Sequence, residues 1–317
     1  MNENLDNLPD QPSDNNSEEM ISNMNPITAA FLGLAGVFVL YQFGGALLTL
    51  AIFGLNFEKA DVNLIRLLTI GGQILFILFP ALMLSKSIYR NVSTALRIKL
   101  PKAKELLLFI IGLIILTPLL QSFLYIQNYF INVFTGYSSF LKSIKDLVDQ
   151  LDKLVQSAYG DLLTSNSLFE SSFIIFVVAV IPALCEETFF RGFVQKSFEQ
   201  KYKPIASALI TALFFGIYHF NPYGLFALIA LGTYFGFAAY TSKSIIVPMT
   251  LHFLNNLFAV VLFLVLGDEE LISSNIAPTG NVINHFIMFF VLLIIFTAFI
   301  IYLKKALVII NKPKETL

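Results

Sequence analysis

Long apolar runs recur along the chain and are separated by short polar segments. Each run holds roughly 17 to 25 residues, the length of helix that crosses the ~30 Å hydrocarbon core of a bilayer. The runs fall near residues 27–54, 65–85, 105–127, 171–195, 204–221, 223–241, 244–266 and 282–303. Only Asn221 and Pro222 separate the fifth run from the sixth, which predicts either a broken helix or a tight hairpin. The pattern predicts an all-α, polytopic membrane helix bundle with about eight transmembrane helices.

One segment between the third and fourth runs is amphipathic. Its apolar residues recur at three- and four-residue steps: Phe140, Leu141, Ile144, Leu147, Val148, Leu151, Leu154 and Val155. Its other positions are charged: Lys142, Lys145, Asp146, Asp149, Asp152 and Lys153. The spacing predicts a helix of about 16 residues, too polar to span, within an extracytoplasmic insert at 131–166. It would lie along the outer membrane surface or cap the bundle; a connector packed on other helices is a simpler interpretation than a substrate lid.

The composition agrees with a membrane protein, because 56% of residues are hydrophobic and only 13% are charged. A soluble surface needs roughly twice that charge. The net charge of -1 provides no basic surface for a nucleic acid. The single cysteine, Cys185, permits no intramolecular disulfide and is more typical of a packing residue than of a metal ligand. Residues 1–26 are polar and acidic, which predicts a disordered tail with no secretory signal before a transmembrane domain at 27–317.

The distribution of basic residues predicts the orientation in the membrane. With eight spans, fifteen of the 20 Lys and Arg residues lie on the side of the N-terminus and five on the other. Basic residues are retained on the cytoplasmic face, so both termini are expected to be cytoplasmic, in the cell (inner) membrane.

Ionisable residues stand out inside three of the apolar runs. They are Glu186, Glu187 and Arg191 in the fourth run, His219 in the fifth and His252 in the seventh. A charge within a span costs at least ~2.5 kcal/mol on insertion scales, so such groups mark a pathway or a reactive site. On a helix, Glu187 and Arg191 are four residues apart and can form an ion pair, whereas Glu186 is turned about 100 degrees away. We therefore predict Glu186 as a general base that Glu187 and Arg191 help to position.

Asn256 follows His252 by one helical turn, so it shares the same face and can donate to an oxyanion. Asn255 points elsewhere. His285 lacks polar companions at helical spacing and is interpreted as an interface residue. A proline lies within four residues of each key polar residue: Pro182, Pro248 and Pro222. Three kinks of this kind would favour a hydrated cavity.

These residues resemble the CPBP family of intramembrane proteases, which includes type II CAAX prenyl proteases and bacteriocin-processing (Abi) proteins. The family pattern is Glu-Glu-x-x-x-Arg, Phe-x-x-x-His and His-x-x-x-Asn on three helices of an eight-helix bundle. The matching residues are Glu186, Glu187, Arg191, Phe215, His219, His252 and Asn256. The resemblance covers residues 186–256, and the earlier spans match only in number and hydropathy.

The resemblance implies hydrolysis of a peptide bond inside the membrane. Glu186 and His219 would activate water, His252 and Asn256 would stabilise the oxyanion, and Glu187 and Arg191 would support them. The family is described as metalloproteases, and Glu186, His219 and His252 would suffice as ligands for Zn²⁺ or another divalent metal. Water activation without metal remains the alternative. The substrate would be a peptide or membrane protein, with or without a prenyl group.

Two other functions fit part of the pattern. A proton-coupled transporter could use Glu186, His219 and His252 as a relay. Many transporters carry an internal repeat, however, and none is found here. A non-catalytic membrane scaffold would be expected to lose parts of the motifs, and all of them are present.

Overall fold

The computed structural model of the protein describes residues 22–54, 61–89, 91–267, 273–276 and 281–311. Within them, seven helical segments are long and apolar enough to cross a membrane, and the shorter apolar helix α11 (Pro204–Tyr218) makes the eighth. The described residues contain no strand beyond an isolated bridge between Ser22 and Tyr89. The predicted polytopic helical bundle is confirmed. Most of the predicted disordered tail, residues 1–21, lies outside the described residues.

The first half of the chain forms three spans. The first comprises α1 (Pro26–Val39), the π-helical segment η1 (Leu40–Gly44) and α2 (Gly45–Phe53). The second comprises α3 (Val62–Gln73), the π-helical segment η3 (Ile74–Leu78) and α4 (Phe79–Ile88). The short helix α5 (Val92–Leu96) leads to α6 (Ala103–Tyr137), which is the third span.

The second half begins with α7 (Ser139–Leu163), the amphipathic helix. The fourth span then comprises α8 (Leu168–Ile175), η4 (Phe176–Val180), α9 (Ile181–Glu187), η5 (Thr188–Val194) and α10 (Gln195–Glu199), of which η4 and η5 are π-helical. The remaining spans are α11, α12 (Leu225–Ser242), α13 (Ile246–Leu266) and α14 (Val282–Ile310).

Polar residues in the loops define where several helices begin. The side chains of Asn25, Asp61, Ser138, Ser167 and Asn281 each accept a hydrogen bond from a backbone N–H in the first turn that follows. Those N–H groups have no acceptor within the helix, so each cap stabilises its helix by about 1 kcal/mol. Side chains in the loops therefore fix where four of the spans and the amphipathic helix begin.

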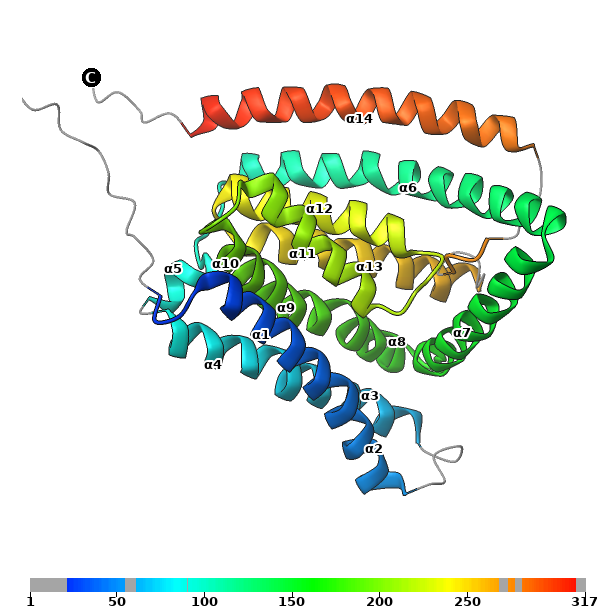
Figure 1. Cartoon of the computed structure of the whole chain (residues 1–317), viewed down its shortest axis with the longest axis horizontal. Helices are drawn as coiled ribbons and strands as arrows, with labels where there is room; N and C mark the ends of the chain where they lie inside the picture. The colour runs from blue at the N-terminus through cyan, green and yellow to red at the C-terminus, as the bar shows by residue number, and fades with distance from the viewer. Residues whose placement is uncertain (1–21, 55–60, 90, 268–272, 277–280, 312–317) are drawn as a thin grey trace, which may run out of the picture.

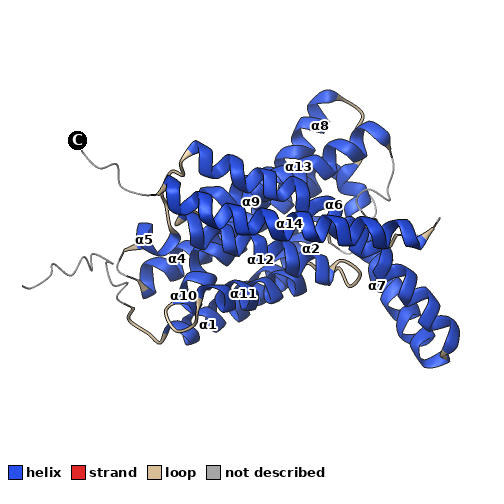
Figure 2. Ribbon diagram, turned by 90° about the horizontal axis from the view of Figure 1, so that it is seen from above, coloured by secondary structure: helices blue, strands red, loops and turns tan. Residues whose placement is uncertain are grey.

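The spans lie roughly side by side in layers (Figure 1). Helices α6 and α14 pair along one side, α11, α12 and α13 occupy the middle, and α1 to α4 form the opposite side. Helix α7 crosses one end of the bundle and projects beyond it when the molecule is turned by 90° (Figure 2). The layers leave α9 and η5 between the first two spans and the α11–α13 layer.

Helices α11 and α12 form a tight hairpin, which decides between the two possibilities predicted for Asn221 and Pro222. A Cβ atom added at Gly236 would come within 2.8 Å of the Ala208 Cβ atom. Small residues allow backbones to approach in this way, and van der Waals packing then holds membrane helices together. The hairpin brings His219, at its tip, back toward the middle of the bundle.

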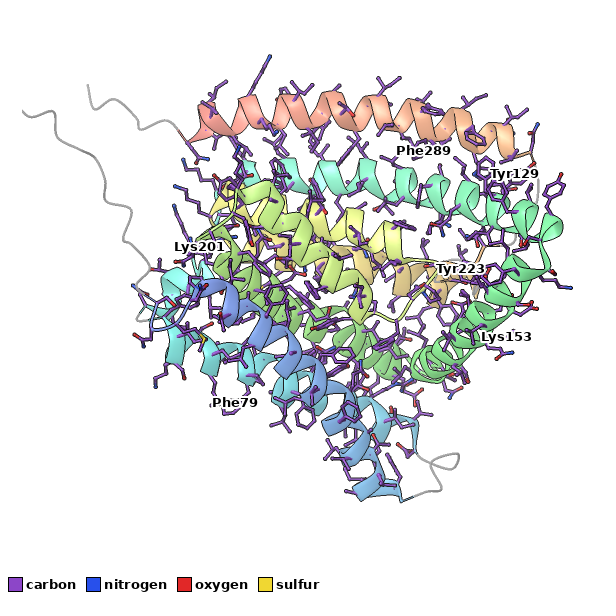
Figure 3. The ribbon with its side chains drawn as sticks, viewed as in Figure 1. Phe79, Tyr129, Lys153, Lys201, Tyr223 and Phe289 are labelled. Carbon is purple, nitrogen blue, oxygen red and sulfur yellow. The ribbon has the colours of Figure 1, made fainter. Side chains whose placement is uncertain are left out.

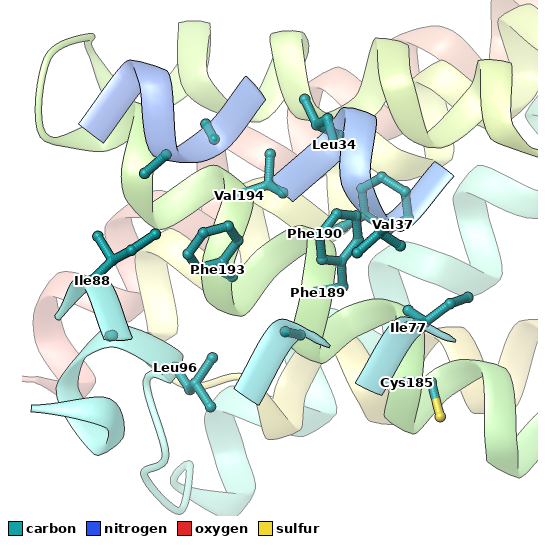
Figure 4. Packing of buried hydrophobic residues seen from close by; sticks show 14 of the residues in the cluster. Leu34, Val37, Ile77, Ile88, Leu96, Cys185, Phe189, Phe190, Phe193 and Val194 are labelled. Atoms are coloured by element: carbon teal, nitrogen blue, oxygen red, sulfur yellow. The ribbon is translucent and has the colours of Figure 1, made fainter. Parts of the chain in front are cut away.

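The largest apolar cluster surrounds η5. Phe189, Phe190 and Phe193 pack against Leu34 and Val37 of α1 (Figure 4). Phe189 and Phe193 have no exposed surface. This packing fixes the rotation of the span that carries the two glutamates.

The two ends of the bundle differ in their polar contacts. At one end, Arg97 pairs with Glu199, and the Lys102 ammonium donates to the Ile310 carbonyl. At the other, the Tyr223 hydroxyl donates to Asp149 of α7. Lys201 and Lys153 mark these opposite ends (Figure 3). At each end, the contacts join segments that the eight-span topology places on the same side of the membrane.

Three sequence-based expectations differ from the structure. Residues 131–137, predicted within the insert, continue α6, and α7 has 25 residues rather than about 16. Two of the three expected proline kinks are absent, since Pro222 lies in the turn of the hairpin and Pro248 lies in the first turn of α13. A proline in the first turn removes no helical hydrogen bond. Of these three prolines, only Pro182 lies in the interior of a span.

Candidate active site

The two glutamates lie where the fourth span changes its helical geometry. Glu186 and Glu187 end α9, which stands between the π-helical segments η4 and η5. Pro182 has no N–H to donate to the carbonyl of Val178, four residues earlier. The amide of Asn256 on α13 donates to that carbonyl at 3.0 Å. The proline thus frees a backbone acceptor that ties α13 to the span carrying the glutamates.

Glu187 and Arg191 form the ion pair predicted from their spacing. Arg191 Nη1 donates to Glu187 Oε1 at 2.8 Å, and neither side chain has exposed surface. Arg191 Nη2 donates to the Gly232 carbonyl at 3.1 Å, and the guanidinium carbon lies 4.3 Å from the centroid of the Phe215 ring. Hydrogen bonds and a cation–π contact therefore compensate part of the cost of burying this charge.

His252 joins the ion pair rather than Glu186. Its Nδ1 lies 2.8 Å from Glu187 Oε1, the same oxygen that Arg191 contacts. A carboxylate only accepts, so Nδ1 carries the proton and donates it, which leaves Nε2 for another partner. Phe235 stacks on the imidazole with the ring centroids 5.7 Å apart. Glu187 therefore sets the orientation and tautomer of His252.

Glu186 faces His219 at the tip of the hairpin. Glu186 Oε2 lies 3.8 Å from His219 Nε2, too far for a direct hydrogen bond. His219 Nδ1 donates to the Phe215 carbonyl at 2.6 Å, so in the neutral ring Nε2 is an acceptor. Glu186 Oε2 is buried and has no hydrogen-bond partner. Two acceptors at this distance call for a molecule that can donate to both.

Both residues line a cavity of about 380 Å³. Most of its wall is aromatic or aliphatic: Val37, Phe38, Tyr41, Ile77, Phe189, Phe190, Tyr218 and Phe220. The polar lining residues are Gln42, Gln73, Glu186 and His219. A largely apolar cavity with a few convergent polar groups is the usual form of a binding site.

Gln73 was missed by the sequence analysis. It is 5% exposed, and its Nε2 donates to Glu186 Oε1 at 3.2 Å. The sequence did hold a signal, because Gln73 is an amide within the second apolar run, where a polar side chain needs a partner. A search of every span for uncharged polar residues would have found it.

The other predicted residues take less central positions. Asn256 is held by the Val178 carbonyl and also accepts from the amide of Asn255 at 3.3 Å, so its role toward an oxyanion stays a prediction. His285 stacks on Tyr125 of α6 with the ring centroids 3.5 Å apart. Cys185 is buried in the apolar cluster around η5.

The three predicted metal ligands do not meet as one group in the part of the chain that the structure describes. Among the described residues, no three His, Cys, Asp or Glu side chains form a group that could hold a metal ion. Glu186 and His219 face each other, and the Nδ1 of His252 is bound to Glu187, which leaves its Nε2 as the only ring nitrogen that could bind a metal. A catalytic zinc site provides three protein ligands and one open position. The metal role predicted for Glu186, His219 and His252 stays a prediction.

The fold and the site define a polytopic helical membrane protein with a carboxylate–histidine centre inside the bundle. Residues 168–258 match the family model described as Type II CAAX prenyl endopeptidase Rce1-like. The match includes all the motif residues from Glu186 to Asn256, and it confirms the resemblance inferred from them. It supports an intramembrane protease role in general. No curated protein and no solved structure matches the chain.

Proposed function

We propose that the protein is an intramembrane endopeptidase that hydrolyses a peptide bond with water activated by Glu186 and His219. The observation that carries this proposal is the pair of acceptors, Glu186 Oε2 and His219 Nε2, facing each other across 3.8 Å beside the cavity. A water molecule that donates one proton to each keeps its lone pairs free for attack. A non-catalytic scaffold does not require that geometry.

The reaction proceeds by addition and collapse. The water oxygen bonds to the carbonyl carbon of the substrate, and its proton moves to the Glu186 carboxylate. When the tetrahedral adduct collapses, the C–N bond breaks and the proton passes to the leaving nitrogen. The products are a carboxylic acid and an amine.

His252 and Asn256 are the proposed donors to the oxyanion. Glu187 accepts from His252 Nδ1, so Nε2 is the nitrogen available to the substrate oxygen, and it donates there when the ring is doubly protonated. Asn256 has a second N–H besides the one bound to Val178. Donors fixed before the reaction stabilise developing charge with little reorganisation.

The substrate is proposed to be a membrane-associated peptide or protein. The aromatic wall of the cavity suits an apolar side chain or a lipid group next to the cleaved bond. Both termini of the protease are proposed to be cytoplasmic, because the basic loops gather at one end of the bundle.

Replacement of Glu186 tests the proposal. We expect Glu186→Ala to abolish cleavage while the protein still inserts and keeps its thermal stability. Terminal proteomics of membrane fractions from cells carrying either protein would identify peptides that need Glu186. Glu170→Ala is the matched control, because Glu170 caps the start of α8 by accepting from Asn166. Unchanged cleavage in Glu186→Ala would remove the protease proposal.

A second experiment addresses the metal. Since the described donors do not form a three-ligand group, we propose activation without metal. We expect activity to persist after dialysis against a strong chelator, with elemental analysis finding no stoichiometric divalent ion. Loss of activity on chelation and its recovery with Zn²⁺ would instead establish a metalloprotease.

A further inference from the structure

Gln73 lies where the second span approaches Glu186 and His219. It is the last residue of α3 and is followed directly by the π-helical segment η3. Such segments shift the phase of a helix and recur at functional sites. Gln73 also lies outside residues 168–258, the part of the chain that matches the family model.

The direction of the Gln73 amide follows from its neighbour. Glu186 Oε1 is an acceptor, so the group at 3.2 Å from it must be the NH₂ end of the amide. The carbonyl oxygen, Oε1, then points away from Glu186. It is buried and has no hydrogen-bond partner.

Helix α3 is held firmly, which fixes where this amide lies. Arg66 is buried. It donates from Nε to the Leu162 carbonyl at 3.1 Å and from Nη2 to the Thr164 carbonyl. These carbonyls belong to the end of α7, where helices leave acceptors without partners. Arg66 therefore anchors the start of α3 as Gln73 contacts Glu186 at its end.

An unpaired buried amide oxygen lowers the stability of the fold unless a ligand donates a hydrogen bond to it. Gln73 lines the same cavity as Glu186 and His219. A peptide substrate offers backbone N–H groups, which are the donors such an oxygen needs. The NH₂ end, meanwhile, holds Glu186 Oε1 and so turns Oε2 toward His219.

We propose that Gln73 is a positioning residue for Glu186 and that its free carbonyl oxygen binds a backbone N–H of the peptide substrate. This inference rests on the proposed protease function. It assigns a substrate contact to a helix of the first half of the chain.

The test uses the full-length protein in liposomes and a quenched fluorescent peptide that spans the cleavage site mapped by proteomics. Gln73→Met keeps the size and flexibility of the side chain and removes the amide. We expect kcat to fall about 10- to 100-fold, because a hydrogen bond to a charged group is lost, and KM to rise several-fold. Gln73→Asn retains an amide on a shorter stem and should recover part of kcat. Gln121→Met, at an exposed glutamine of α6, is the control and should match the wild type.

N-methylated versions of the same peptide test the substrate contact without any variant. Each lacks one backbone N–H. We expect one methylated position to weaken binding to the wild type and to have little effect on Gln73→Met. Equal tolerance of all methylated peptides by the wild type would overturn the substrate contact.

The outcomes separate this inference from the proposed function. If the wild type and Glu186→Ala process the peptide alike, the protease proposal fails. If Glu186→Ala is inactive and Gln73→Met retains the wild-type kcat, only the role of Gln73 is overturned.

Discussion

The buried ion pair of Glu187 and Arg191 is the residue-scale feature on which the site depends most. One oxygen, Glu187 Oε1, receives both Arg191 and His252 at 2.8 Å. Arg191 also spans to α12 through the Gly232 carbonyl. A Cβ atom at Gly232 would come within 3.0 Å of Arg191 Nη2, so this position has little room for a side chain. The ion pair therefore links three helices as well as orienting His252.

Removing one charge of this pair is expected to destabilise the protein strongly. Arg191→Met leaves the Glu187 carboxylate buried without its cation, which typically costs about 3 to 5 kcal/mol. We expect a large fall in the thermal midpoint in detergent. The double variant Glu187→Met with Arg191→Met should recover much of it, because no uncompensated charge remains. A double variant less stable than Arg191→Met would contradict this account of the pair.

At the scale of elements, the sequence predicted where the helices lie better than how each one is rotated about its axis. The turn of about 100 degrees per residue correctly separated Glu186 from Glu187 and paired Glu187 with Arg191. It did not predict that His252 contacts Glu187, because η4 and η5 change the rotation of the span. Local sequence carries little signal for π-helical segments, which are stabilised by the packing around them. The gap between His219 and Glu186 likewise depends on the hairpin and not on any one helix.

Helix α7 packs its polar side against the bundle and leaves its apolar side exposed. Its packed side is polar: Asp149 accepts from Tyr223 and Lys145, and Asp152 accepts from Asn275 and Gln156. Burial raises the pKa of the Asp152 carboxyl. The hydrogen bond from the Asn275 amide partly offsets this rise, and the negative charge of Asp149 adds to it. Its apolar residues are exposed instead: Phe140, Leu141, Ile144, Leu147, Leu151 and Leu154. This arrangement fits a helix whose apolar side lies in a membrane interface.

Site-directed labelling can test the position of α7. In a Cys185→Ser background, Leu147→Cys and Lys142→Cys place an environment-sensitive fluorophore on opposite sides of the helix. We expect blue-shifted emission at position 147 in liposomes, with quenching by nitroxide lipids. Position 142 should report water and serves as the control. Aqueous emission at both positions would show that another protein surface, and not lipid, covers the apolar side.

At the scale of the whole molecule, hydropathy was sufficient for the architecture. The predicted eight-span topology assigns loops to two sides, and loops of the same side meet in the structure, as Arg97 and Glu199 do. Span lengths follow directly from bilayer thickness, so composition constrains them strongly. The closure of the cavity could not be predicted, because it depends on which side of α1 and α3 meets η5. The contact of Gln73 with Glu186 and the aromatic wall contributed by α1 and η1 depend on this packing.

The cavity has walls from two separate parts of the chain. Glu186 and His219 come from the segment that matches the family model, whereas Val37, Phe38, Tyr41 and Gln73 come from the first two spans. Glu186 and His219 and much of the surrounding wall thus come from different parts of the chain. We expect chimeras that exchange these two N-terminal spans between related sequences, with Gln73 kept, to alter which substrates are accepted while Glu186 and His219 stay in place.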